Sequence, residues 1–231
     1  MYRDRLLRVS REGEVLQDID VLEILYENGL DRHIHKAGKL GSRDVTHLND
    51  IEPLPSSMAD AYPLFEGGDL AVSLKALDLV FVVDPDTRRV KWHASHPFIA
   101  QHDPDFVGGG WIGVFDNNSD GTARGTVLGG SRIVMVQPHT DSVTVRFPTS
   151  RSEPLYTTYR GKWQQLENGN MLLTEAIAGR VVEVAADGRT VWEWIAGPYG
   201  ESFVPEVSKG ARTDLTKEDV ASWPCGGERS G

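Results

Sequence analysis

The chain is poor in cysteine, in long apolar runs and in basic charge. Its single cysteine, Cys225, leaves no partner for an intrachain disulfide and no thiolate cluster for a metal ion. No stretch approaches the roughly 20 apolar residues of a membrane-spanning helix. Lysine and arginine number 24 against 34 aspartates and glutamates, a formal net charge of −10. We therefore expect no membrane partner and no nucleic-acid partner, because phosphate binding requires clustered basic residues.

What remains is the composition of an ordinary soluble globular protein. The 231 residues are 39% apolar and 25% charged, enough for one sizeable core or one repeat array. The first residues lead into a strand-like run rather than the apolar core of a signal peptide. We therefore expect no secretion signal in this sequence, and the sequence does not indicate a cellular compartment. An acidic balance still allows a small anionic substrate in a local pocket.

Strand-like segments recur in three blocks, and turn-forming residues separate them. The segments are 69–74, 79–83 and 90–92 in the first block, 111–115, 132–136 and 143–147 in the second, and 171–174, 180–184 and 190–194 in the third. A further strand led by His47, His102 or Trp163 precedes each set of three. Four strands per block, repeated in series, predict an all-β protein built as a β-propeller of four-stranded blades. A β-sandwich would explain the alternation but not the repeated register.

The blades are expected at residues 46–97, 98–150 and 158–197. Residues 1–45 should form a partial blade, with strands at 5–9 and 15–19, a short helix at 21–26 and a loop, and residues 198–231 form a tail. Propellers have four to eight blades. Either the tail completes a small ring, or the three and a half blades belong to a larger one, which we favour. Open sheet edges could then pair with another copy.

Histidines are the main candidates for chemistry. A radial repeat would bring His47 and His102 to one site from distant parts of the chain. His33 and His35 have the alternate spacing that places two imidazoles on one side of a strand, a metal-binding pattern, but no third ligand lies nearby, so we expect a polar loop. The remaining histidines, His93, His96 and His139, are expected to be exposed near strand ends or turns. The glycine run at 108–110 is interpreted as a hairpin loop.

An ordered set of motifs supports a more specific hypothesis. It comprises Thr-His-Leu-Asn-Asp-Ile-Glu-Pro-Leu at 46–54, Gly-Asp-Leu-Ala-Val-Ser-Leu-Lys at 68–75, Gln-His-Asp-Pro-Asp-Phe at 101–106, Phe-Asp-Asn at 115–117, Arg-Gly-Lys-Trp-Gln at 160–164 and Asn-Gly-Asn at 168–170. The set resembles the bacterial arylsulfotransferases, from Asp4 to about Tyr199. The resemblance implies a six-bladed propeller with its active site in the central channel. It also implies transfer of a sulfo group from an aryl sulfate to a phenol, with no cofactor.

The resemblance also implies roles for individual residues. His102 is the histidine that becomes sulfated, and His47 with Asn49 matches the second active-site histidine and its asparagine. Lys75 stands where the family usually has arginine, which keeps the charge but loses the bidentate fork. Trp163 stands where relatives often have histidine. The family also draws a channel histidine from a blade upstream of the region present here, and its members are often exported.

Each of these residues has a catalytic or ligand-binding interpretation and a purely structural one. A neutral imidazole is a suitable nucleophile, and a second one can exchange protons with the phenols. His102 could instead cap the turn at Asp103 and Pro104, and His47 with Asn49 could bond loop backbone. Lys75 binds a sulfo group or lies in solvent. Trp163 either forms an aromatic wall against a phenol ring or packs between two blades.

Two further possibilities concern charge near the site. Arg160 is a weaker candidate for anion binding. Asp103 and Asp105 orient His102 or simply form a turn with Pro104.

Three functions follow from these alternatives. The first is an arylsulfotransferase-like enzyme that acts through His102 and His47, with Asn49, Lys75, Arg160 and Trp163 at the substrate. The second is a non-catalytic propeller that binds a small anion or a protein. A metal-dependent hydrolase is the least supported, because carboxylates and histidines nowhere show ligand-like spacing.

Overall fold

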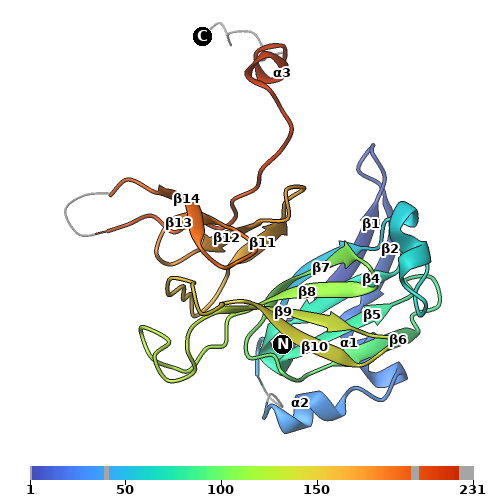
Figure 1. The fold of residues 1–231 in the computed structure, drawn as a ribbon. Coiled ribbons are helices and arrows are strands. Elements are labelled where there is room, and N and C mark those ends of the chain that lie inside the picture. Colours follow the sequence, from blue (N-terminus) through green and yellow to red (C-terminus); the bar gives the residue numbers. More distant parts are fainter. Residues whose placement is uncertain (1, 39–41, 199–202, 224–231) are drawn as a thin grey trace, which may run out of the picture.

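The protein is described by a computed structural model that covers residues 2–38, 42–198 and 203–223. Cys225 lies outside the described residues. Three four-stranded antiparallel sheets and a two-stranded hairpin make up its β-structure (Figure 1). The all-β prediction and the four-stranded repeat are thus confirmed. The described residues form no closed ring, so the six-bladed ring stays a prediction.

Each sheet is a blade in which every strand pairs with the next one along the chain. The first blade holds β3 (Leu48–Pro53), β4 (Leu70–Leu74), β5 (Leu79–Val83) and β6 (Val90–Ala94). The second holds β7 (His102–Gly108), β8 (Trp111–Asp116), β9 (Arg132–Gln137) and β10 (Ser142–Phe147). The third holds β11 (Lys162–Gln165), β12 (Met171–Glu175), β13 (Arg180–Val184) and β14 (Thr190–Ile195).

The middle strands read as continuous apolar runs because both of their faces are covered. All five residues of β5 are buried, and so are all five of β12. One apolar cluster lies between the first and second blades and includes Val82 and Ile112. Another lies between the second and third and includes Phe115 and Leu173. Burial on both sides selects β-branched and large aliphatic residues, which stabilise the face-to-face stacking of the blades.

The first strands, β3, β7 and β11, are the inner strands of the blades, and each lies beside the next. β3 and β7 both begin with a β-bulge, and the residues left out of the pairing are Asn49 and Asp103. A bulge redirects its side chain away from the strand's own sheet. In both cases the side chain reaches the next blade: Asn49 Nδ2 donates to Gln101 O at 2.8 Å, and Asp103 Oδ2 accepts from the Trp163 N–H at 2.6 Å.

Lys162 connects all three inner strands. Its ammonium group lies at the start of β11 and donates to Asp103 of β7 at 2.5 Å and to Asp50 of β3. The side chains of all three residues are largely buried. Burial opposes the charge of Lys162, but the adjacent carboxylates outweigh it and raise the pKa of the ammonium group. One cation therefore joins strands from three blades.

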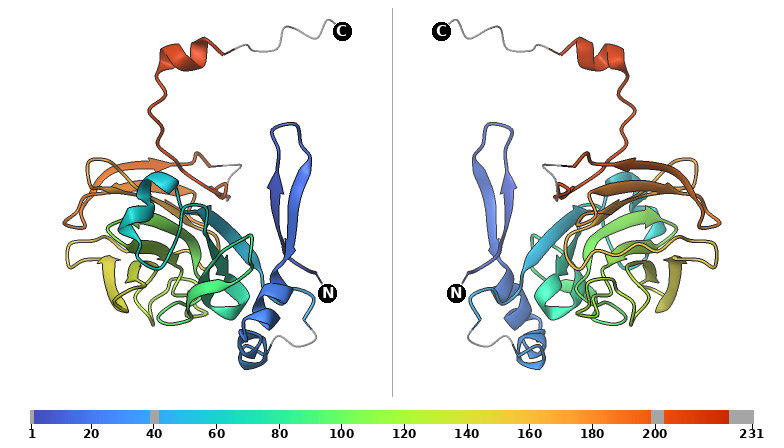
Figure 2. Two further views of the ribbon diagram at one scale, coloured as in Figure 1. Left: turned by 90° about the vertical axis from the view of Figure 1, so that its right-hand side faces the viewer. Right: turned by 90° about the vertical axis from the view of Figure 1, so that its left-hand side faces the viewer.

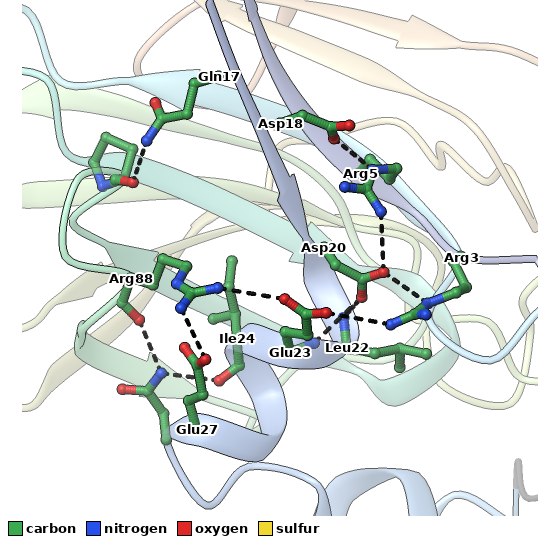
Figure 3. Close-up of polar contacts among 12 residues, drawn as sticks. Arg3, Arg5, Gln17, Asp18, Asp20, Leu22, Glu23, Ile24, Glu27 and Arg88 are labelled. Atoms are coloured by element: carbon green, nitrogen blue, oxygen red, sulfur yellow. Dashed lines mark hydrogen bonds and ion pairs between the residues drawn. The ribbon is translucent and has the colours of Figure 1, made fainter.

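A hairpin and a helix precede the first blade. These are β1 (Arg5–Val9), β2 (Val15–Asp20) and α1 (Val21–Glu27), the last being the short helix predicted from the sequence. Asp20 caps α1 by accepting the Leu22 N–H at 2.9 Å. Its other carboxylate oxygen pairs with Arg3 at 2.7 Å (Figure 3). The cap thus also fixes the chain that leads into β1.

Polar contacts attach this N-terminal unit to the turn between β5 and β6 (Figure 3). Arg88 pairs with Glu27 at 3.0 Å and Glu23 at 3.3 Å, and Gln17 Nε2 donates to Pro85 O at 2.7 Å. Apolar residues of the hairpin base and α1 join the core of the first blade. The tip of the hairpin projects away from the blades (Figure 2).

The segment containing His33 and His35 is neither a strand nor a polar loop, which corrects the prediction. It forms α2 (Arg32–Lys36), with His33 buried and His35 exposed. Two residues apart on a helix, the imidazoles point in different directions and cannot share a ligand as they would on a strand.

The other helices are short. Two 3-10 helices, η1 (Ser56–Ala61) and η2 (Lys75–Leu77), flank β4, and α3 (Lys217–Ala221) projects from the blades after an extended segment (Figure 1). Within the described ranges, no helix has the length and apolar character required to cross a bilayer.

The lysine bridge yields a stability prediction. Lys162→Met leaves two carboxylates facing each other with no counter-charge, and breaking a buried pair in this way should lower the free energy of unfolding by about 3 kcal/mol. Urea unfolding measures the change. Lys217→Met in the exposed helix α3 is the matched control. Adding Asp103→Asn to Lys162→Met should restore part of the loss, because it removes one of the unpaired charges. Equal stability of Lys162→Met and the control would show that the bridge is not a major constraint.

Candidate active site

The predicted histidines lie at or next to the starts of the inner strands. His102 is the first residue of β7, His47 immediately precedes β3, and Arg160 lies two residues before β11. Lys75, the first residue of η2, donates its backbone N–H to His47 O at 3.1 Å. The charges of Lys75 and His47 both reach His102, because each lowers its pKa. Three blades therefore contribute to one site around His102.

His102 is buried and fixed in one tautomer. It is 7% exposed, and its Nδ1 lies 2.7 Å from Asn117 Oδ1 and 3.1 Å from Ala100 O. Both neighbours are acceptors, so Nδ1 must carry the proton and Nε2 the lone pair. Nε2 accepts the Arg160 N–H at 3.2 Å. Burial lowers the pKa of His102 to about 4, and Lys75 adds to this while the bond to Asn117 opposes it. At neutral pH the imidazole is uncharged and has the electron pair of a nucleophile.

Asn117 also holds the loop that covers His102. Its Nδ2 donates to Thr157 O at 2.8 Å and to Arg160 O at 2.7 Å, and the whole side chain is buried. One amide therefore sets the tautomer of His102 and the position of the third blade's loop. The sequence motif contained Asn117, but no role was inferred for it because its partners are backbone atoms far away in the chain.

His47 is oriented by a carboxylate that sequence reasoning missed. Its Nδ1 lies against Asp44 Oδ2, and Asp44 Oδ1 accepts the His47 backbone N–H at 3.0 Å. The backbone of His47 has a positive φ of 49°, and the imidazole is 44% exposed. With Nδ1 engaged, Nε2 is the atom left for exchange of protons. The spacing Asp-x-x-His is a local signal that could have been noticed.

Asn49 and Lys75 differ in their freedom to bind a ligand. The Asn49 amide is committed to Gln101 O, directly before His102, and its Oδ1 is buried without a partner among the described residues. Asn49 thus positions the start of β7. In the described ranges, no carboxylate lies within ion-pairing distance of Lys75. Its charge is available to an anion beside His102.

Arg160 contributes its backbone rather than its charge. The guanidinium pairs with Glu206 in the C-terminal segment, and the Tyr159 hydroxyl donates to the same carboxylate at 2.7 Å. A positive φ of 59° at Arg160 turns its N–H toward His102 Nε2. The predicted role for the Arg160 side chain in anion binding would require the pair with Glu206 to break.

Trp163 lies in the core between the second and third blades. It is 3% exposed, and its Nε1 donates to Asp103 O at 3.1 Å. A Cβ atom on Gly113 would lie 2.0 Å from Trp163 Cζ2, so the indole needs a glycine opposite it. This is the packing between blades that the sequence allowed as one of two roles. Asp103 likewise bonds Lys162 and Trp163, not His102.

Acidic side chains line the far end of the inner strands. Glu52 and Asp105 border an open pocket of about 330 Å³ together with Gln164. Burial and the nearby carboxylates raise the pKa of Asp105 to about 8, and burial also raises the pKa of Glu52. Across the described part of the chain, no group of three or more histidine, cysteine, aspartate or glutamate side chains has an arrangement that could hold a metal ion.

Known proteins offer two comparisons. The family model for arylsulfotransferases (ASST) matches residues 4–197. A crystal structure of a protein of unknown function from Bacteroides caccae is similar in fold, with a TM-score of 0.53 and 15% sequence identity. The similarity covers 83% of this chain and 59% of that one, so the chain spans less than two thirds of that protein's length. No curated protein matches the sequence.

Asp105 generates a prediction about pH. Its pKa is about 8 in the folded protein and about 3.9 in an unfolded chain, so between these values only the folded state keeps the proton. Stability is therefore lost as the pH rises through this window. Asp105→Asn is neutral throughout, and we expect it to be about 2 kcal/mol more stable than the natural protein near pH 8 and equal to it near pH 4.

Thermal unfolding across this range tests the expectation, with Asp60→Asn on the exposed turn η1 as the control. Parallel pH profiles for Asp105→Asn and the natural protein would contradict a proton held on Asp105.

Proposed function

The chain belongs to the arylsulfotransferase family, and we propose on that premise that it moves a sulfo group from an aryl sulfate to a phenol through His102. The observation that carries the proposal is the state of His102. Two acceptors fix its proton on Nδ1, and burial keeps the ring neutral, so Nε2 has a lone pair at neutral pH. No nucleotide sulfate donor and no metal enters the scheme.

In the first step, the Nε2 lone pair of His102 attacks the sulfur of the aryl sulfate. The sulfur–oxygen ester bond breaks, and its electron pair leaves with the phenolate. A proton from His47 converts the phenolate into a phenol. The enzyme then carries an Nε2–sulfo group, and the Nδ1 proton stays on the ring because the amide of Asn117 is not a base.

In the second step, His47 takes the proton of the acceptor phenol. The phenol oxygen attacks sulfur, the Nε2–sulfur bond breaks, and its electron pair returns to His102 as the lone pair. Asp44 keeps His47 in one orientation for both transfers. The second step is the reverse of the first with a different phenol, so the protein ends in its original state.

Charge on the sulfo oxygens is met by Lys75 and by the Arg160 N–H. Sulfuryl transfer resembles phosphoryl transfer in requiring donors around the equatorial oxygens. The Arg160 N–H now lies on Nε2, so attack requires it to move aside, and it would then lie next to the transferred group. Lys75 offers a point charge instead of a planar fork, so transition-state binding should be weaker than with arginine. Trp163 has no part in this scheme, because it is buried between blades.

A second candidate function is a propeller that binds an anion without turning it over. Two observations favour it: Nε2 of His102 already accepts a backbone N–H, and Glu206 already neutralises the Arg160 guanidinium. Such a protein would bind an aryl sulfate beside Lys75 and leave it intact.

Incubation with 4-nitrophenyl sulfate and a phenol distinguishes the two. The enzyme should release nitrophenolate and carry a sulfo adduct on the peptide containing His102. His102→Ala should lower the rate at least about a thousandfold, as removal of a nucleophile does. His47→Gln should lower it about a hundredfold, the usual contribution of an acid–base group.

His139→Ala is the matched control, because His139 lies exposed at the turn between β9 and β10. Transfer that survives His102→Ala would sink the assignment. Saturable binding of the aryl sulfate without release or adduct would establish the binding scaffold instead.

A further inference from the structure

A second group of basic side chains lies where α2 meets the end of β6. They line an open pocket of about 580 Å³ and come from Arg32, His33 and Lys36 on α2 and from His93 and His96 on or just after β6. The hydroxyl-bearing Ser95 completes its polar lining. Three of the histidines for which the sequence predicted exposure or a loop, His33, His93 and His96, thus lie around one pocket.

The pocket has positive charge without a counter-charge. Within the described residues, neither Arg32 nor Lys36 has a carboxylate at ion-pairing distance, and no acidic residue lines the pocket. Asp78 borders an adjoining smaller pocket, and its carboxylate accepts the Ala100 N–H at 2.7 Å. Elsewhere in this acidic chain, cations such as Arg88 and Lys91 are paired. A site that keeps two cations together in an acidic protein is arranged for an anion.

His33 provides a second, independent observation. The side chain is buried, with 7% exposure, and its Nε2 has no hydrogen-bond partner among the described residues. Its ring lies edge-on to that of His93, with centroids 5.9 Å apart. A buried polar atom without a partner is costly and calls for a ligand or a water molecule. When protonated, the imidazole becomes a donor at both nitrogens.

We propose that this pocket binds a small tetrahedral oxyanion, either free sulfate or phosphate or the same group on an ester. Its lining provides a guanidinium fork, an ammonium group, imidazole nitrogens and a hydroxyl, which suits a ligand made of acceptor oxygens. The pocket lining shares no residue with the His102 site, and the proposal does not depend on the transfer reaction.

Binding should be tighter at lower pH. In the free pocket, burial lowers the pKa of His33 and of His93, and the charge of Arg32 lowers both further. The other charged or titratable groups around the pair are Lys36 and His96 in the pocket and Asp78 behind it. A bound anion favours the charged imidazoles and raises their pKa, so binding takes up protons. Affinity for sulfate therefore falls as the pH rises from the acid side, below the ordinary histidine pKa of about 6.5, to values where both imidazoles are neutral.

Calorimetric titration of the full chain with sodium sulfate and sodium phosphate, at constant ionic strength with chloride, tests the proposal. Arg32→Gln with Lys36→Gln should weaken binding at least tenfold, which corresponds to about 1.4 kcal/mol. Arg8→Gln with Arg11→Gln removes two exposed charges from the β1–β2 hairpin and is the matched control, expected to bind normally. The ring proton signals of His33 and His93 should shift during the same titration.

Three outcomes would overturn the proposal: no saturable binding, an equal loss in the Arg8 and Arg11 control, or binding that Lys75→Met removes and Arg32→Gln with Lys36→Gln leaves intact, which would assign the anion to the His102 site. Activity toward aryl sulfates should survive Arg32→Gln with Lys36→Gln, so failure of this site and failure of the transfer reaction remain distinguishable. Phenyl phosphate identifies the source. If phenyl phosphate binds more tightly than inorganic phosphate, the ligand is an ester. If the two bind equally, the ligand is the free ion.

Discussion

The ammonium group of Lys162 is the constraint on which the arrangement of the blades depends. It lies between a carboxylate of β3 and a carboxylate of β7, largely out of water. A buried pair of this kind adds little net stability, but it strongly disfavours any arrangement that separates its members. Glu52 and Asp105 lie on the same inner strands, and Lys162, together with Lys209 near Glu52, offsets part of the repulsion among these carboxyl groups. Lys162 therefore favours the observed register of the blades over arrangements that separate the inner strands.

That register assembles a site that no single blade contains. His102 directly precedes Asp103, the residue that Lys162 holds, so the bridge also fixes the start of β7. The Asn117 amide then joins His102 to the loop of the third blade. His47 precedes the inner strand of the first blade, and its charge lowers the pKa of His102. Enclosure by three blades removes water from His102, and the loss of hydration keeps its imidazole neutral. The same packing that buries the apolar clusters therefore sets the chemistry of the site.

The strands were predictable from the sequence, but the contacts between blades were not. Strands such as β5 and β12 are short apolar runs bounded by turns, a local pattern that survives folding. The bridge from Lys162 to Asp50 joins residues 112 positions apart in the sequence, so no local pattern signals it. The polar loop expected around His33 was wrong, because a five-residue segment gives too little periodicity to indicate a helix that is stabilised by packing. His47 and His102 were predicted to share a site from the blade repeat and from the family resemblance. Both relate residues that are far apart in the sequence.

The tautomer of His102 tests the account most directly, because both the packing and the chemistry depend on it. Long-range proton–nitrogen NMR spectra of the histidine rings report which nitrogen carries the proton and when the ring becomes charged. The account predicts a neutral His102 with its proton on Nδ1 and a bare Nε2 from neutral pH down to near its pKa of about 4. A proton on Nε2, or an imidazolium at neutral pH, would leave no lone pair for the sulfo group and would contradict it.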